Sequence, residues 1–259
     1  MIAFAFRRLC LCFLIAGVLA GIAAAPVAAQ GKTPAQSLPK AEREKIESVV
    51  KEYLRNNPEV IIEAIRNLRE RQERKKHEQT KANLVKLQGE LLSDPDTPVG
   101  GNPKGSVSIV EFFDYRCGYC KRAFPDLVKL IESDKNIRFV FKEFPILGPQ
   151  SVTASKVGLA AWILDKSKYQ AFHKAMMGAK GALPENRVMN FATQSGYDVK
   201  ALQKAMADPR VEATIEKTYN LAKALDINGT PAFVIGNQII RGAVDLETLK
   251  TLVSEARGS

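Results

Sequence analysis

Two cysteines, Cys117 and Cys120, lie three residues apart in the stretch EFFDYRCGYCKRAFPDL, where an apolar run gives way to an amphipathic one. A disulfide across so short a spacing closes almost no loop, so it would constrain the unfolded chain little. A closed structural zinc site needs four ligands, and the rest of the chain offers only two amino-terminal cysteines and two histidines. The spacing therefore favours a reactive dithiol over a structural staple or a zinc site.

The first of these cysteines is expected at the start of a helix. Free backbone N–H groups and the helix dipole stabilise a thiolate there, which brings a cysteine pKa into the range of roughly 3.5 to 7.5. We therefore predict that Cys117 attacks and that Cys120, one turn later, resolves the mixed disulfide. Copper(I) also accepts thiolate and thioether ligands. We interpret Met176 and Met177 as core residues, and copper(I) binding by the two cysteines remains an alternative of a different functional class.

The segments around the dithiol alternate between strand and helix patterns. VSIVEFF (107–113) reads as a buried strand, followed by a helix from the first cysteine to about Ser133 and a second strand at 137–144. A block of helical periodicity covers residues 154–225, and PAFVIGNQIIRG then predicts two strands around a Gly-Asn turn. A last helix is expected from about Leu246 to Ala256. This order predicts an α/β domain over residues 93–259 with a helical insertion.

Residues 41–92 predict a separate helical stalk. Apolar side chains recur at spacings of three and four, and a second helix is expected to start at Asn57-Pro58-Glu59, with Asn57 as its cap. The apolar stripe then stops, because residues 69–78 contain no apolar side chain. Such short stripes favour self-association of the stalk, with packing against the chain's own domain as the alternative. The stripes consist of Ile46, Val49, Val50, Tyr53 and Leu54, then Ile61, Ile62, Ile65 and Leu68.

The amino terminus has the pattern of a secretory signal peptide over residues 1–29: a charged start, an apolar middle and a small-residue end. We expect cleavage after Ala29, with an uncleaved anchor as the alternative, and residues 30–40 read as a linker. Export would place the dithiol where disulfides persist. The formal net charge of +10 would fall to +8 after cleavage. We interpret this excess as a solvated basic face and expect no nucleic-acid partner.

The motifs EFFDYRCGYC and GTPAFVIG together resemble the DsbA family of exported thiol-disulfide oxidoreductases, which have the thioredoxin fold. The resemblance implies a cis peptide bond at Thr230-Pro231, facing the cysteines, with Thr230 and Pro231 holding an extended substrate strand. It also implies that Glu111 is a buried acid that helps move the proton of the dithiol. The alternative for Glu111 is a solvent-facing edge position. The resemblance implies no cofactor.

The residues between the cysteines depart from the strongly oxidising DsbA proteins, which carry Pro-His there. Gly118-Tyr119 is similar to the dipeptide of the disulfide isomerase DsbC, and we count both residues among those that contact substrate. Residues 41–92 resemble the amino-terminal region of ScsC-like proteins, some of which are trimers. The combined resemblance implies a periplasmic disulfide reductase or isomerase. Its partners would be client proteins with disulfides, a membrane redox partner and further copies of itself. A DsbA-type dithiol oxidase is the alternative within the same class.

Overall fold

The computed structural model describes residues 38–258. The expected signal peptide over residues 1–29, and all of the expected linker except its last three residues, lie outside the described residues. Contacts divide the chain into two units, residues 1–64 and 65–259, and each is treated separately below. Among the described residues, no helix is both long enough and apolar enough to cross a lipid bilayer.

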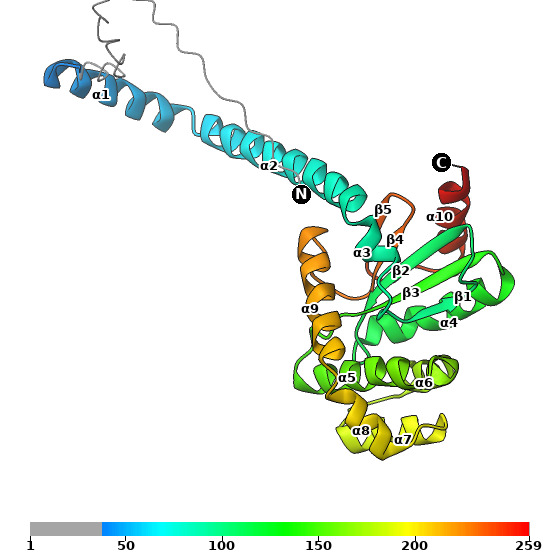
Figure 1. The fold of residues 1–259 in the computed structure, drawn as a ribbon. Coiled ribbons are helices and arrows are strands. Elements are labelled where there is room, and N and C mark those ends of the chain that lie inside the picture. Colours follow the sequence, from blue (N-terminus) through cyan, green and yellow to red (C-terminus); the bar gives the residue numbers. More distant parts are fainter. Residues whose placement is uncertain (1–37, 259) are drawn as a thin grey trace, which may run out of the picture. The chain divides into compact units, whose positions relative to one another are not determined.

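Ten helices and five strands follow one another along the described residues (Figure 1). They are α1 Lys40–Asn56, α2 Glu59–Lys86, α3 Gln88–Leu92, β1 Val99–Gly101, β2 Val107–Phe113, α4 Gly118–Ser133, β3 Ile137–Glu143, α5 Pro149–Leu164, α6 Lys166–Gly178, α7 Glu185–Gln194, α8 Val199–Met206, α9 Pro209–Ala224, β4 Ala232–Ile235, β5 Gln238–Arg241 and α10 Leu246–Gly258.

The sheet confirms the predicted α/β fold with a thioredoxin-like order of elements. Its strands run in the order β1-β3-β2-β4-β5. β2 and β3 are parallel, because α4 crosses between them, whereas β4 and β5 pair antiparallel to their neighbours. Helices α5 to α9 form the predicted insertion between β3 and β4. The short edge strand β1 was not predicted, because it lies in a segment rich in Pro and Gly.

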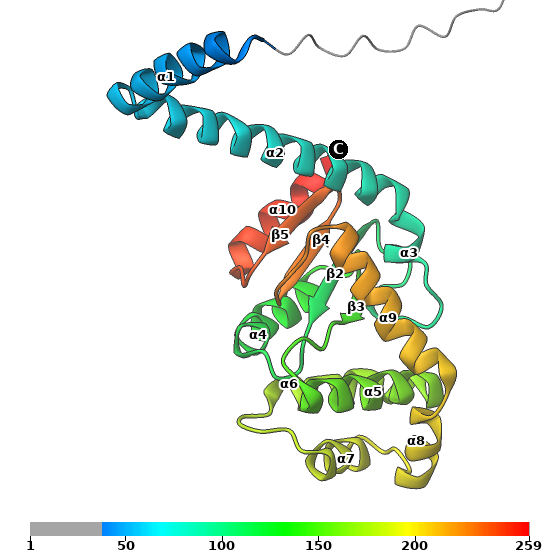
Figure 2. The ribbon, with the colours of Figure 1, turned by 90° about the vertical axis from the view of Figure 1, so that its left-hand side faces the viewer.

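Both faces of the sheet are covered, as the buried strands require. Alternate residues of β2 divide between two apolar clusters: Ile109 and Phe113 pack with α4, α10 and the insertion, whereas Val110 and Phe112 pack with α9 and α3. The two views of the ribbon show helices on both sides of the strands (Figure 2). Leu84 at the end of α2 belongs to the second cluster. The last turn of α2 is thus part of the core of the carboxy-terminal unit.

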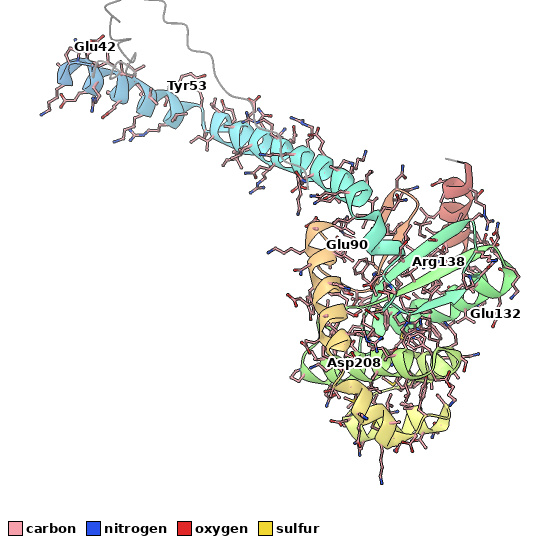
Figure 3. The ribbon with its side chains drawn as sticks, in the orientation of Figure 1. Glu42, Tyr53, Glu90, Glu132, Arg138 and Asp208 are labelled. Atoms are coloured by element: carbon pink, nitrogen blue, oxygen red, sulfur yellow. The ribbon has the colours of Figure 1, made fainter. Side chains whose placement is uncertain are left out.

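Two basic residues of β3 join α3 to the sheet. Lys142 is 1% exposed, and its Nζ donates to the carbonyl of Glu90 at 2.9 Å and to Thr97 Oγ1 at 3.0 Å. Arg138 Nη2 donates to the carbonyl of Leu92 at 2.6 Å, and Figure 3 labels Arg138 and Glu90. Both cations bind carbonyls at the carboxyl end of α3, where helix carbonyls lack partners within the helix. Burial lowers the pKa of Lys142 to about 8.

The amino-terminal unit exposes its apolar side chains. No residue of α1 is buried, and Tyr53, labelled in Figure 3, is 54% exposed. The prediction that the Asn57 side chain caps α2 is wrong. The side-chain Nδ2 of Asn57 instead donates to the carbonyl of Tyr53 at 2.9 Å and so closes α1. Four apolar side chains of α1, Ile46, Val49, Val50 and Tyr53, are thus exposed among the described residues.

A substitution at Gly158 of α5 can test how closely this helix approaches the sheet. A Cβ at this position would lie 2.6 Å from Glu143 Oε1 and 3.1 Å from the Tyr115 hydroxyl. We predict that Gly158→Ala lowers the free energy of unfolding by about 1–3 kcal/mol, because both neighbours are buried and cannot yield freely. The control is Gly89→Ala in α3, where a Cβ meets nothing within 4 Å. It should stabilise by up to about 1 kcal/mol through helix propensity. Urea unfolding measures the free energy of unfolding of both variants. An equal change in the two variants would contradict the close approach of α5 to Glu143 and Tyr115.

Candidate active site

The turn between β2 and α4 is built around Asp114, whose side chain is fully buried. Its Oδ1 accepts the N–H of Arg116 at 2.7 Å and its Oδ2 accepts the N–H of Leu147 at 3.0 Å. Its backbone carbonyl accepts the N–H of Cys117 at 2.9 Å. Asp114 thus sets the direction in which the chain enters α4. Sequence reasoning missed this residue, although an Asp three positions before a helix N-cap is a recognisable turn signal.

Cys117 is the N-cap of α4, as predicted from the helix start. Its Sγ accepts the N–H of Cys120 at 3.4 Å. Hydrogen bonds from the Cys120 and Thr230 side chains and from backbone N–H groups lower the pKa of Cys117 to about 5, although burial acts in the opposite direction. A thiolate at this position is stabilised by donors that the helix start leaves free.

Cys120 has the opposite character. It is 0% exposed, and burial raises the pKa of its thiol, with further increases from Cys117 and Glu111. Both cysteines are free thiols in this structure. One sulfur is therefore poised as a thiolate at the start of α4, and the other is kept protonated one turn inside the helix.

Glu111 lies on the central strand β2 and is fully buried, which excludes the solvent-facing alternative. Neither of its carboxyl oxygens has a hydrogen-bond partner among the described residues. Burial, followed by the negative charge of Cys117, raises its pKa to about 8. A carboxyl group with a pKa near neutrality, coupled to both thiols, can take up and release a proton at working pH.

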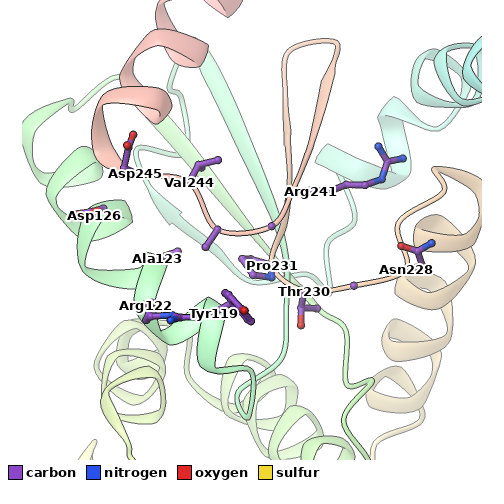
Figure 4. A pocket seen from close by; sticks show the side chains of 13 residues that line it. Tyr119, Arg122, Ala123, Asp126, Asn228, Thr230, Pro231, Arg241, Val244 and Asp245 are labelled. Atoms are coloured by element: carbon purple, nitrogen blue, oxygen red, sulfur yellow. The ribbon is translucent and has the colours of Figure 1, made fainter.

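The Thr230-Pro231 peptide bond is cis, as the resemblance implies. The carbonyl oxygen of Thr230 lies 3.2 Å from Cys117 Sγ and accepts a hydrogen bond from it when Cys117 is protonated. A groove of about 650 Å³ begins at this contact and is called the α4 groove here; it is lined by Tyr119, Arg122, Ala123 and Asp126 of α4, by residues 228–231 and by residues 241–245. Figure 4 shows α4 along one side of the groove and Thr230 and Pro231 beside Tyr119. The structure thus brings the dithiol and this loop together.

The residues between the cysteines face solvent, whereas the residue after Cys120 faces the insertion. Gly118 and Tyr119 are both exposed, and the Tyr119 ring lies 4.1 Å from the Arg122 guanidinium carbon, a cation–π contact. Lys121 points toward the insertion, where its Nζ donates to the carbonyls of Met176 and Ala179 at 2.8 and 2.6 Å. Burial is the main cause that lowers the pKa of Lys121 to about 8. Lys121 therefore joins the helix of the dithiol to the end of α6.

Metal ligands are sparse around the dithiol. No group of three or more His, Cys, Asp or Glu side chains that could hold a metal ion occurs among the described residues. Met176 and Met177 are buried in the first apolar cluster, as predicted. His173 is buried among aromatic rings, its Nδ1 lies 3.1 Å from the Tyr115 hydroxyl, and burial lowers its pKa to about 3. Hydrogen bonds to Cys117 are thus what lowers its pKa.

Two family models match separate stretches of the chain. The family model of the DSBA-like thioredoxin domain matches residues 108–254. The model of the copper resistance protein ScsC N-terminal domain matches residues 42–75. Curated relatives include Na(+)/H(+) antiporter NhaA 1 of Salinispora arenicola, and the chain spans about a quarter of its length (25%).

Three solved structures show the likeness in three dimensions. A thioredoxin-like oxidoreductase from Silicibacter pomeroyi is 42% identical, with a TM-score of 0.64, over 66% of this chain and 98% of that one. The thiol-disulfide exchange protein alpha-DsbA2 from Wolbachia pipientis is 33% identical, with a TM-score of 0.65, over 68% and 95%. Proteus mirabilis ScsC in a transitional conformation is 30% identical, with a TM-score of 0.64, over 86% and 98%.

The last of these matches covers 86% of the chain, which is more than residues 65–259 supply, so it extends into the amino-terminal unit. A buried acid, two cysteines of opposite pKa shift and a cis-proline loop in contact with Cys117 fit the chemistry that the comparisons indicate. The chain belongs to the DSBA-like thioredoxin family of thiol-disulfide oxidoreductases and carries an ScsC-type amino-terminal domain.

Proposed function

We propose that this protein reduces or isomerises disulfides in periplasmic client proteins through Cys117 and Cys120. The observation that carries the proposal is the opposed pKa shift of the two thiols: the pKa of Cys117 is lowered to about 5, whereas that of Cys120 is raised. An attacking sulfur must be a thiolate, and a resolving sulfur must stay protonated until the mixed disulfide has formed. Thr230, Pro231, Gly118 and Tyr119 would contact the client along the α4 groove.

The first step forms a mixed disulfide. The Cys117 thiolate attacks one sulfur of a client disulfide, the client S–S bond breaks, and the second client sulfur leaves as a thiolate that takes a proton from water. In isomerisation, a client thiolate then attacks the client sulfur bound to Cys117. The client disulfide re-forms in a new pairing and Cys117 is released as a thiolate, with no net electron transfer.

Reduction uses the second cysteine. Cys120 loses its proton to the Glu111 carboxylate and attacks Cys117 Sγ, so that the client sulfur leaves as a thiolate and two electrons pass to the client. The proton transfer needs Glu111 in its charged form, which grows as pH rises through its pKa of about 8. The mixed disulfide removes the charge of Cys117, which lowers the pKa of Glu111 and favours this form. A membrane redox partner would then reduce the Cys117–Cys120 disulfide.

The low pKa of Cys117 also favours a second function, that of a DsbA-type oxidase. Stabilising the thiolate stabilises the reduced enzyme, which makes the corresponding disulfide a stronger oxidant. The dipeptide Gly118-Tyr119 adds no positive side chain beside the sulfur. The reduction potential of the pair, measured by equilibration with glutathione, separates the two functions. A potential well above that of the glutathione pool would favour the oxidase.

The amino-terminal unit supplies the assembly in this proposal. Ile46, Val50 and Tyr53 of α1 are 46%, 49% and 54% exposed, and a second copy of the same stripe would cover them. An oligomer, with three chains as our proposal, would hold several thiols near one client and raise their effective concentration. A neighbour from Salmonella enterica is described as a periplasmic thioredoxin-like protein, which supports export of this chain after cleavage of residues 1–29.

The order of attack is tested by trapping. We predict that Cys120→Ser accumulates a mixed disulfide with a disulfide-bonded peptide, because Cys117 can still attack and nothing resolves the product. Cys117→Ser should accumulate almost none, because the remaining thiol is buried and has a raised pKa. Mass spectrometry of acid-quenched samples counts the adducts. Accumulation only in Cys117→Ser would reverse the assignment.

Glu111→Gln tests the buried acid in two ways. The folded pKa of about 8 exceeds the ordinary value of 4.5, so the stability due to Glu111 is complete below pH 4.5 and is lost as pH rises through 8. We predict that Glu111→Gln stabilises the reduced protein, relative to the unaltered one, by about 4 kcal/mol more at pH 9 than at pH 4. Resolution of the mixed disulfide should slow, and its pH dependence should disappear. Urea unfolding and stopped-flow exchange measure these effects.

The assembly is tested by Ile46→Asn with Val50→Asn in the full-length protein. We predict loss of the oligomer and of most activity toward a scrambled-disulfide substrate, with unchanged dithiol exchange, because only the exposed stripe is altered. Lys45→Asn with Lys51→Asn is the matched control. Light scattering and the refolding assay serve as readouts. A doubly substituted protein that isomerises as well as the control would remove the stripe from the mechanism.

A further inference from the structure

The loop of residues 225–231, between α9 and β4, determines where Thr230 lies. At its start, the N–H of Ile227 donates to the carbonyl of Ala222 at 2.7 Å. At its end, the N–H of Gly242 donates to the carbonyl of Pro231 at 2.9 Å. Residues 228 and 229 between them are exposed. The position of Thr230, and therefore its contact with Cys117, depends on how firmly the base of this loop is held.

Asp226 forms that base and adopts a backbone conformation that is uncommon for a residue with a side chain, with φ of 55°. Its carbonyl accepts Nε and Nη2 of Arg241 at 3.2 and 3.0 Å, and its Oδ2 lies 3.3 Å from Nη2. Arg241 pairs with Ala232, the residue after Pro231. Its side chain reaches away from Tyr119 (Figure 4). Arg241 therefore acts on the loop.

The other oxygen of Asp226 binds α2. Lys76 Nζ lies 2.9 Å from Asp226 Oδ1. Two turns further along α2, Asn83 Nδ2 donates to the carbonyl of Ala224 at 2.7 Å, and Leu84 is buried in the cluster that contains residues of α9 and the loop. All of these residues belong to the carboxy-terminal unit. One carboxylate thus joins a stalk helix to the strand beside Pro231.

We propose that Asp226 is a positioning residue for client binding, which links Lys76 of α2 to Arg241 of β5 and so holds the 225–231 loop in its client-binding position. The inference rests on the proposed function, because it concerns the same groove. Lys76, Asp226 and Arg241 touch neither sulfur, so they act on the affinity for the client through the loop and not on the chemistry. The Lys76–Asp226 pair is partly exposed, at 53% and 31%. Its effect is therefore modest and screened by salt.

The test uses the full-length protein and an uncharged peptide with one disulfide. Lys76→Ala should raise KM about two- to five-fold, with kcat and the Cys117 pKa, followed by thiolate absorbance, unchanged. Asp226→Asn keeps a residue type that tolerates the same φ and should raise KM similarly. Adding Lys76→Ala to it should have no further effect. Lys76→Arg, which keeps the positive charge, should have the KM of the unaltered protein. Arg74→Ala, which removes a neighbouring charge of α2, is the matched control.

Salt gives an independent readout. In the unaltered protein KM should rise with ionic strength, and in Lys76→Ala this rise should be smaller, because only the Asp226–Arg241 pair remains to be screened. A KM that none of these substitutions moves, additive effects in the double variant, or an equal effect of Arg74→Ala would overturn the inference. A lower melting temperature with unchanged KM would also overturn it, by showing a purely structural role. Absence of exchange in the unaltered protein would overturn the proposed function and this inference together.

Discussion

The free N–H groups at the first turn of α4 are the feature on which the site depends. They stabilise negative charge at one sulfur only, because Cys117 caps the helix while Cys120 lies one turn inside it and fully buried. This difference of a single turn separates the pKa values of two chemically identical side chains. Asp114 fixes the start of this helix, because its carboxylate accepts the N–H of Arg116 and its carbonyl accepts the N–H of Cys117. The hydrogen bond with Thr230 lowers the pKa of Cys117 further, whereas burial acts against that shift. Burial and Glu111 raise the pKa of Cys120.

Glu111 extends the same electrostatics into the interior. A carboxyl group without hydrogen-bond partners is costly to bury, and here the cost is limited because the group is held neutral near physiological pH. A second buried carboxyl, Glu143 on β3, has a strongly raised pKa through burial, although Ser155 Oγ donates to it at 2.7 Å. The sheet thus carries two buried carboxyl groups, Glu111 on β2 and Glu143 on β3. In the proposed mechanism Glu111 takes the proton of Cys120.

The stalk and the catalytic unit follow different physical rules. The catalytic unit buries both faces of its sheet, whereas α1 buries nothing within its own unit. Within the carboxy-terminal unit, the second half of α2 is polar along most of its length and contacts the rest of that unit through Asn83, Leu84 and Lys76. Such a helix can hold the base of the 225–231 loop, because its contacts fall at residues next to that loop.

The sequence by itself determined the order of elements and the dithiol, and it predicted Cys117 as the attacking sulfur, because strand and helix periods and the spacing of Cys117 and Cys120 are local patterns. It also determined the apolar stripes of α1 and α2, most of whose side chains are exposed in the part of the chain that the structure describes. Glu111 and the cis bond before Pro231 came from resemblance, and the geometry around them came from the fold. Asp114, Lys121 and Asp226 could not be assigned from sequence. Their roles depend on partners that lie 33, 55 and 150 residues away along the chain, and only tertiary packing brings such distant groups within hydrogen-bond or ion-pair distance.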